Sequence, residues 1–98
     1  MKINLEKLNK ITEEVKLMFM APDMNFRILE PTVWVKKVHE QNDMHPVGTK
    51  CVVFASIRAT DVGIKTQTAF FVMFEGDESP CFILKYKLEE TDEKPEFI

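Results

Sequence analysis

The sequence predicts an α+β domain, with one amphipathic N-terminal helix packed on one face of a four-stranded antiparallel meander sheet (αββββ). Apolar residues recur every three or four positions between residues 3 and 20, which is the period of a helix buried on one side. From residue 32 onward, runs of β-branched and aromatic residues alternate with turn formers, as in strands joined by hairpins. We assign residues 1–88 to this single domain and residues 89–98 to an acidic C-terminal tail.

The predicted helix covers residues 3–20. Asn4 is a suitable N-cap, because its side chain can accept a hydrogen bond from a backbone N–H of the first turn. Ala21 and Pro22 end the run. This helix is expected to pack on the sheet rather than to bind a partner, through Leu5, Leu8, Ile11, Thr12, Val15, Met18 and Phe19.

Residues 32–38 are the predicted first strand, with Val33 and Val35 facing the helix and Trp34 and Lys36 facing away from it. A polar loop follows over residues 39–49. Its side chains include four metal-ligand types, but their spacing matches no ligand pattern, so we predict a solvated loop and no metal site: His39, Glu40, Asp43 and His45.

A hairpin over residues 50–74 is the centre of the predicted sheet. Asp61-Val62-Gly63 separates two strand-like runs, and Gly63 supplies the positive φ of a tight turn. A three-residue loop pairs Phe54 with Phe70 and Val52 with Val72. Because side chains alternate between faces, these four share one face, which we call the outer face.

Residues 75–80 are turn formers, and an alternating strand follows over residues 81–88. A loop at residues 76–79 adds Cys81, Ile83, Lys85 and Lys87 to the outer face. The inner face, which we expect beneath the helix, then carries Val53, Ala55, Ile57, Phe71, Met73, Phe82, Leu84, Tyr86 and Leu88. A slip of one residue in either hairpin would exchange the two faces.

The composition is that of an ordinary globular domain with a formal net charge of −3, and the excess of acid lies in residues 75–98. The predicted register places Cys51 and Cys81 on opposite faces, so we expect no disulfide between them. The sequence shows no signal peptide, membrane-spanning run or cofactor motif. We therefore expect a cytoplasmic protein without a cofactor or a membrane partner.

One helix can cover only one face of the sheet, which leaves the outer face open. Burying a Phe or Val side chain contributes about 1.5–3 kcal/mol, so an open apolar cluster of this size predicts a cover. We expect a non-enzymatic binding or regulatory module, an inhibitor or adaptor of a larger machine, that forms a homodimer or binds another protein through Val52, Phe54, Phe70, Val72, Phe74 and Ile83.

Three alternatives remain open. Aromatic rings beside cations are typical of surfaces that bind single-stranded nucleic acid, with the acidic tail as a competitor, and the candidate contacts are Trp34, Lys36, Arg58, Lys85 and Lys87. The sheet could instead curl around its apolar cluster and hold a small apolar ligand. An enzyme would need Cys81 or Ser56 as nucleophile and His39 or His45 as base, but no motif brings them together, so we predict no catalytic residues.

Overall fold

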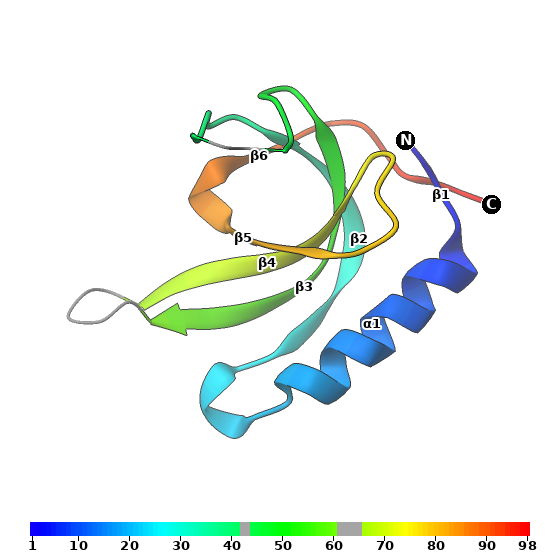
Figure 1. The fold of residues 1–98 in the computed structure, drawn as a ribbon. Coiled ribbons are helices and arrows are strands. Elements are labelled where there is room, and N and C mark those ends of the chain that lie inside the picture. The colour runs from blue at the N-terminus through cyan, green and yellow to red at the C-terminus, as the bar shows by residue number, and fades with distance from the viewer. Residues whose placement is uncertain (42–43, 61–65) are drawn as a thin grey trace.

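The structure is a computed structural model that describes residues 1–41, 44–60 and 66–98 (Figure 1). One α-helix precedes a curled antiparallel sheet of five strands, which confirms the α+β class. The predicted four-stranded meander is right only in part, because a fifth strand joins the sheet. The short elements are β1 (Lys2–Ile3), η1 (Pro22–Met24), η2 (Lys85–Lys87) and β7 (Glu96–Phe97).

The helix α1 (Leu5–Phe19) begins as predicted, because the Asn4 side chain accepts a hydrogen bond from the Lys7 backbone N–H at 3.1 Å. Four side chains of the predicted stripe are buried: Leu8, Ile11, Thr12 and Val15. The buried Thr12 hydroxyl donates to the Leu8 carbonyl at 2.8 Å. Leu5 and Met18 were expected on the packed side but are 39% and 74% exposed, so the packed stripe is narrower than predicted.

The sheet has the strand order β5-β4-β3-β2-β6. Its members are β2 (Arg27–Lys36), β3 (Lys50–Thr60), β4 (Thr66–Phe74), β5 (Cys81–Leu84) and β6 (Leu88–Glu90). β2 begins five residues before the predicted strand and takes in the preceding connector. The predicted boundary between domain and tail at residue 89 falls inside β6.

The curl of the sheet follows from the chain path after β5. η2 ends this strand, and β6 then pairs with β2 at the opposite edge of the sheet, with Leu88 opposite Lys36. Because β5 and β6 are close in sequence but lie at opposite edges, the two edges must approach each other. Figure 1 shows the resulting curl, with α1 on its convex side and η2 on the other.

A β-bulge in β3 overturns part of the predicted register. Thr60 lies opposite Thr66, and the alignment shifts by one residue between Val53 and Ala55. Because one extra residue reverses the side-chain alternation, Val52 and Phe54 join the convex core, whereas Val53 faces the concave side. The predicted turn at residues 61–63 lies outside the described residues.

β4 and β5 are offset by two residues from the predicted alignment, with Phe71 opposite Phe82. An even offset preserves the faces, so Cys81 and Ile83 lie on the concave side as predicted for the outer face. Leu88 was expected on the inner face. It is buried in the concave core instead, because η2 interrupts the strand and β6 belongs to the other edge.

Two apolar cores lie on the two sides of the sheet. The convex core lies under α1 and contains Ile3, Leu8, Ile11, Val15, Val52, Phe54, Ala55, Ile57, Ala69, Phe71 and Met73. The concave core contains Cys51, Val53, Phe70, Val72, Phe74 and Leu88, with Leu29, Trp34, Cys81 and Ile83 packed against it. Both cysteines are free and belong to the concave side, so their predicted placement on opposite faces is wrong, owing to the bulge.

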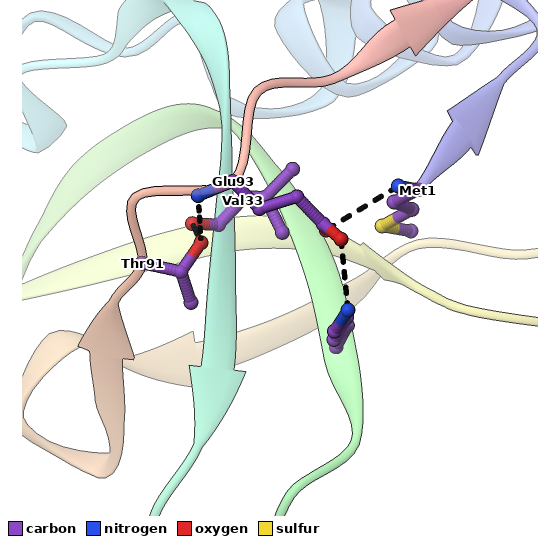
Figure 2. A network of polar contacts seen from close by, with 5 residues as sticks. Met1, Val33, Thr91 and Glu93 are labelled. Carbon is purple, nitrogen blue, oxygen red and sulfur yellow. Dashed lines mark hydrogen bonds and ion pairs between the residues drawn. The ribbon is translucent and has the colours of Figure 1, made fainter.

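The C-terminal residues are bound to the rest of the fold. β7 pairs in parallel with β1, and Figure 2 shows Glu93 beside the Met1 amino group, while Thr91 donates to the Val33 carbonyl. Lys50 Nζ also donates to Glu93 at 2.8 Å, and this hydrogen bond, together with the Met1 amino group, lowers the pKa of Glu93. The acidic tail is therefore an anchored segment.

Candidate functional site

The six residues expected to form an open interface do not lie on an open surface. Val52, Phe54, Phe70, Val72 and Phe74 are each 5% exposed or less, and Ile83 is half-buried. The prediction of an open outer face is wrong for two reasons. The bulge turns Val52 and Phe54 toward α1, and the curl lets the chain cover the remaining residues.

Different side chains cover the two ends of the concave core. The His45 ring stacks on Phe74, with ring centroids 3.9 Å apart and an interplanar angle of 13°. At the other end, Trp34 packs edge-on against Phe70, with centroids 5.1 Å apart. The concave face therefore ends in an imidazole on one side and an indole on the other, and each end has its own polar residues.

The first end contains His45, Asp77 and Cys81, which we call the His45 cluster. One ligand-type atom from each residue lies within 4.8 Å of the others, and His45 Nε2 lies 2.8 Å from Asp77 Oδ2. The three side chains come from the β2–β3 loop, the β4–β5 turn and the start of β5. The spacing of residues within the loop could not predict this set, because Asp77 and Cys81 follow His45 by more than 30 residues.

Backbone contacts position the cluster. Lys36 is 3% exposed and donates from Nζ to the His45 carbonyl at 2.9 Å. The Asp77 backbone N–H donates to the Phe74 carbonyl at 3.0 Å, in a turn where Gly76 has a φ of 89°. His39 is exposed, and Asp43 lies outside the described residues, so among the described ligand-type residues of this loop only His45 belongs to the cluster.

The thiol of Cys81 is held in its neutral form. Burial raises the pKa of Cys81, the Asp77 charge raises it further, and Lys36 offsets part of the shift. The pKa of Cys51 is about 12, mainly because of burial. A protonated thiol is a poor nucleophile, so the proximity of Cys81 and His45 does not by itself provide catalysis. Ser56, the other candidate nucleophile, lines a hollow beside Arg58.

The other end of the concave face opens into two neighbouring hollows. One, of about 450 Å³, is lined by Trp34, Lys37, Gln67, Thr68, Lys85, Tyr86 and Leu88. The other, of about 300 Å³, shares Gln67 and Thr68 with the first and adds Asn25, Arg27, Ser56, Ile57 and Arg58. We call the cations and aromatic rings of the two hollows the basic-aromatic band: Arg27, Trp34, Lys37, Arg58, Lys85 and Tyr86.

The register explains why the band lies on one face. Arg27 is directly opposite Ser56 on β3, and Arg58 is directly opposite Thr68 on β4. Directly opposed residues share a face, and residues two apart along a strand do too, so Arg27 and Arg58 lie on the concave side with Phe70. Lys85 extends from η2 with its Nζ 6.0 Å from the centre of the Phe70 ring.

The four cations of the band have no acidic partner among the residues that the structure describes. No carboxylate from these residues lines either hollow, and the ion pairs among them involve other cations. Lys87 is different, because Glu40 accepts its hydrogen bond and thereby raises the pKa of the Lys87 ammonium group. The band is therefore a concentration of positive charge that the described residues do not neutralise, on a chain whose net charge is −3.

The structure divides the five predicted nucleic-acid contacts. Trp34, Arg58 and Lys85 belong to the band, whereas Lys36 and Lys87 lie at the end that holds the His45 cluster. Sequence reasoning missed Arg27, Lys37 and Tyr86. Strand alternation would have identified Arg27 if the predicted first strand had begun at residue 27. It could not identify Tyr86, because η2 sets the position of that ring.

The sheet curls, as one of the alternatives from the sequence expected, but the concave core fills the inside of the curl. A third hollow lies outside the curl, beside β1 and the start of α1, and is lined by Ile3, Leu8, Ile11, Val52 and Met73 among others. Its volume of about 170 Å³ is below the roughly 300 Å³ of ordinary ligand pockets. This hollow is therefore small for an apolar ligand.

Comparison with family models, with curated proteins and with solved structures returns no match for this chain. None of the helices in the described part of the chain combines the length and apolarity that crossing a bilayer requires.

Proposed function

We propose that the protein is a non-enzymatic module that binds single-stranded nucleic acid on the basic-aromatic band. The observation that carries this proposal is a set of four cations that have no acidic partner in the described part of the chain and lie beside two accessible aromatic rings. Cations contact phosphates, and rings stack on bases, so the band offers both interactions that a single strand requires.

The two rings differ in how they support stacking. Trp34 is half-buried, and its indole N–H donates to Thr32 at 2.9 Å, so its orientation is fixed before a ligand binds. Tyr86 is 57% exposed on η2, with Lys87 Nζ 5.8 Å from its ring centre. A fixed ring loses little conformational freedom on binding, so Trp34 is the expected main stacking residue. Stacking on such a ring contributes about 1–3 kcal/mol per base.

A single strand suits this surface better than a duplex. The rings line hollows on the concave side of a curled sheet, and only unpaired bases expose their faces for stacking. A homodimer or a protein partner, the leading expectation from the sequence, needs the apolar face that is now buried. An acidic protein surface would still be attracted by the same cations, which makes it the rival ligand.

Intrinsic fluorescence tests the proposal at the site itself, because Trp34 is the only tryptophan in the chain. We expect single-stranded oligonucleotides to change the emission of Trp34 at low salt. The affinity should fall as salt rises, with a log–log slope of about 0.7 for each phosphate contact on a single strand. Replacing Trp34 with Leu should weaken binding of a labelled oligonucleotide, measured by anisotropy, by about 1–3 kcal/mol.

Matched charge variants separate this site from general electrostatic attraction. Arg58→Gln and Lys85→Gln should each reduce the salt slope by about 0.7, the value of one lost contact. Lys10→Gln removes the same charge from the exposed side of α1 and should leave the slope unchanged. Absence of binding at low salt, or an equal effect of Lys10→Gln, would overturn the proposal, and binding of an acidic peptide alone would favour a protein ligand.

A further inference from the structure

We infer that His45, Asp77 and Cys81 form a binding site for a zinc ion. The three residues supply the nitrogen, oxygen and sulfur ligands that Zn²⁺ takes in proteins. Their ligand-type atoms lie within 4.8 Å of one another although the residues come from three separate segments of the chain. This inference is independent of nucleic-acid binding, because the His45 cluster lies at the other end of the concave face.

The ligand atoms would have to shift by at most about 1 Å to accept the ion, since they already lie within 4.8 Å of one another. Ligands at 2.0–2.3 Å from a tetrahedral zinc lie about 3.3–3.8 Å apart. His45 Nε2 and Asp77 Oδ2 are now 2.8 Å apart, so the two groups would need to separate by roughly half an ångström. Asp77 lies in the turn between β4 and β5, outside the hydrogen-bonded strands, so its side chain can make this movement without a change in strand pairing.

The surroundings hold the imidazole in place. Its ring is stacked on the buried Phe74, and the His45 carbonyl accepts the hydrogen bond from Lys36. A side chain whose ring and backbone are both held loses little freedom when it binds a metal. The backbone of Cys81 is also held in place, because this residue begins β5 and pairs with Val72 of β4.

The local charges are balanced once a divalent ion is present. Zn²⁺ would displace the proton of the neutral Cys81 thiol to water. The resulting thiolate and the Asp77 carboxylate neutralise the ion, and the remaining Lys36 charge faces Glu40 in the same hollow. That hollow, of about 380 Å³, is also lined by His45 and Cys81. It gives water access to a fourth coordination position, as in zinc sites with three protein ligands.

Titration of the metal-free protein with Zn²⁺ tests the site by calorimetry. We expect saturation at one ion per chain and a rise in the thermal unfolding temperature. Cys81→Ser, His45→Gln and Asp77→Asn should each weaken binding by more than about 100-fold, because loss of a residue that merely orients a ligand costs only about 10–100-fold. A smaller loss for Asp77→Asn would overturn its assignment as a ligand.

Co²⁺ identifies the sulfur ligand directly. The cobalt-loaded protein should show a thiolate-to-metal charge-transfer band that disappears in Cys81→Ser and persists in Cys51→Ala, the variant of the other cysteine. His39→Gln is the matched histidine control, since His39 is exposed and lies outside the cluster. Circular dichroism confirms that each variant is folded. Failure of Zn²⁺ to bind, or unchanged binding in Cys81→Ser and His45→Gln, would overturn the inference.

Discussion

The two ends of the concave face are built on the same strand, but the basic side chains at each end have different partners. Phe74 of β4 supports the His45 cluster, and Phe70 of the same strand supports the basic-aromatic band. Near the cluster, Lys36 donates to a carbonyl and Lys87 pairs with Glu40. In the band, four cations have no acidic partner among the described residues. A basic residue on this face therefore has a partner where the β2–β3 loop lies beside it, as it does for Lys36 and Lys87.

The largest expected effect comes from removing the aromatic support at each end. Phe70 and Phe74 are 5% and 3% exposed, so replacing either with Ala should lower the free energy of unfolding by about 3–5 kcal/mol. Urea denaturation measures this loss. Under conditions where both variants remain folded, Phe70→Ala should also weaken oligonucleotide binding, because Trp34 loses the ring it packs against. Phe74→Ala should leave oligonucleotide binding unchanged.

If both variants weakened oligonucleotide binding equally, the two ends would not be separate sites. A loss of less than about 1 kcal/mol for either variant would contradict the closed concave core itself. Cys51, which is buried directly opposite Phe74, provides a comparison, because Cys51→Ala removes core volume without removing a ring.

Replacing one lysine at each end sharpens the comparison further. Lys36→Met removes the hydrogen bond that the Lys36 ammonium group donates to the His45 carbonyl, and the loss of a hydrogen bond from a charged group costs about 1.5–3 kcal/mol of stability. Lys85→Met changes an exposed side chain, so the free energy of unfolding should stay within about 0.5 kcal/mol while oligonucleotide affinity falls. Thermal unfolding and anisotropy measure the two properties. The reverse pattern would mean that the roles of the two lysines are exchanged.

The sequence predicted the helix, its N-cap and the strand-like segments, because these depend on local spacing and on one capping side chain. It did not reveal the bulge at Phe54, since a run in which every residue is apolar gives no alternation to mark an extra residue. The fifth strand was missed because Leu88 continues the alternation of residues 81–88, and only η2 separates it from β5. These two features closed the face that the sequence had left open.

The candidate sites were predicted to a different extent. Three of the five proposed nucleic-acid contacts lie in the band, because aromatic residues and cations on one strand face can be identified from alternation alone. The residues of the His45 cluster come from a loop, a turn and a strand, and their spacing in the sequence does not predict that they lie close together. Contacts of this kind depend on the curl of the sheet, which in turn depends on where β6 pairs.

Acidification should affect the stability at the His45 end. The pKa of Glu40 lies below its ordinary value of 4.5, chiefly because Lys87 donates a hydrogen bond to it. A carboxyl whose pKa is lowered by folding stabilises the fold above its ordinary pKa, and this stabilisation is lost as the pH falls through the lowered value. Lys87, whose pKa is raised above 10.5, contributes below that value and loses its contribution as the pH rises through the folded-state pKa.

The thermal unfolding temperature of Glu40→Gln should therefore lie below that of the unmodified protein at neutral pH, and the two should converge in acid below the lowered pKa. Glu13→Gln, on the exposed side of α1, is the control for a general change in net charge. A constant difference between the two proteins across the acid range would show that the pair with Lys87 does not form in solution.

The smallest expected effect concerns Glu90, a carboxylate that the register places beside the band. Glu90 on β6 is directly opposite Trp34, so the two side chains share the concave face, whereas its neighbour Glu89 is opposite Val35 and points the other way. Because like charges repel, Glu90→Gln should strengthen oligonucleotide binding, but by less than about fivefold, since an exposed charge interaction contributes at most ~1 kcal/mol.

Glu89→Gln removes the same charge from the opposite face and should have a weaker effect at low salt. Anisotropy titrations at low and high salt measure both variants, and the difference between them should vanish as salt screens the repulsion. Equal gains would mean that the oligonucleotide responds to the net charge of the chain. A gain confined to Glu90→Gln would place the phosphates on the concave face beside Trp34, because the two variants differ only in the face from which the charge is removed.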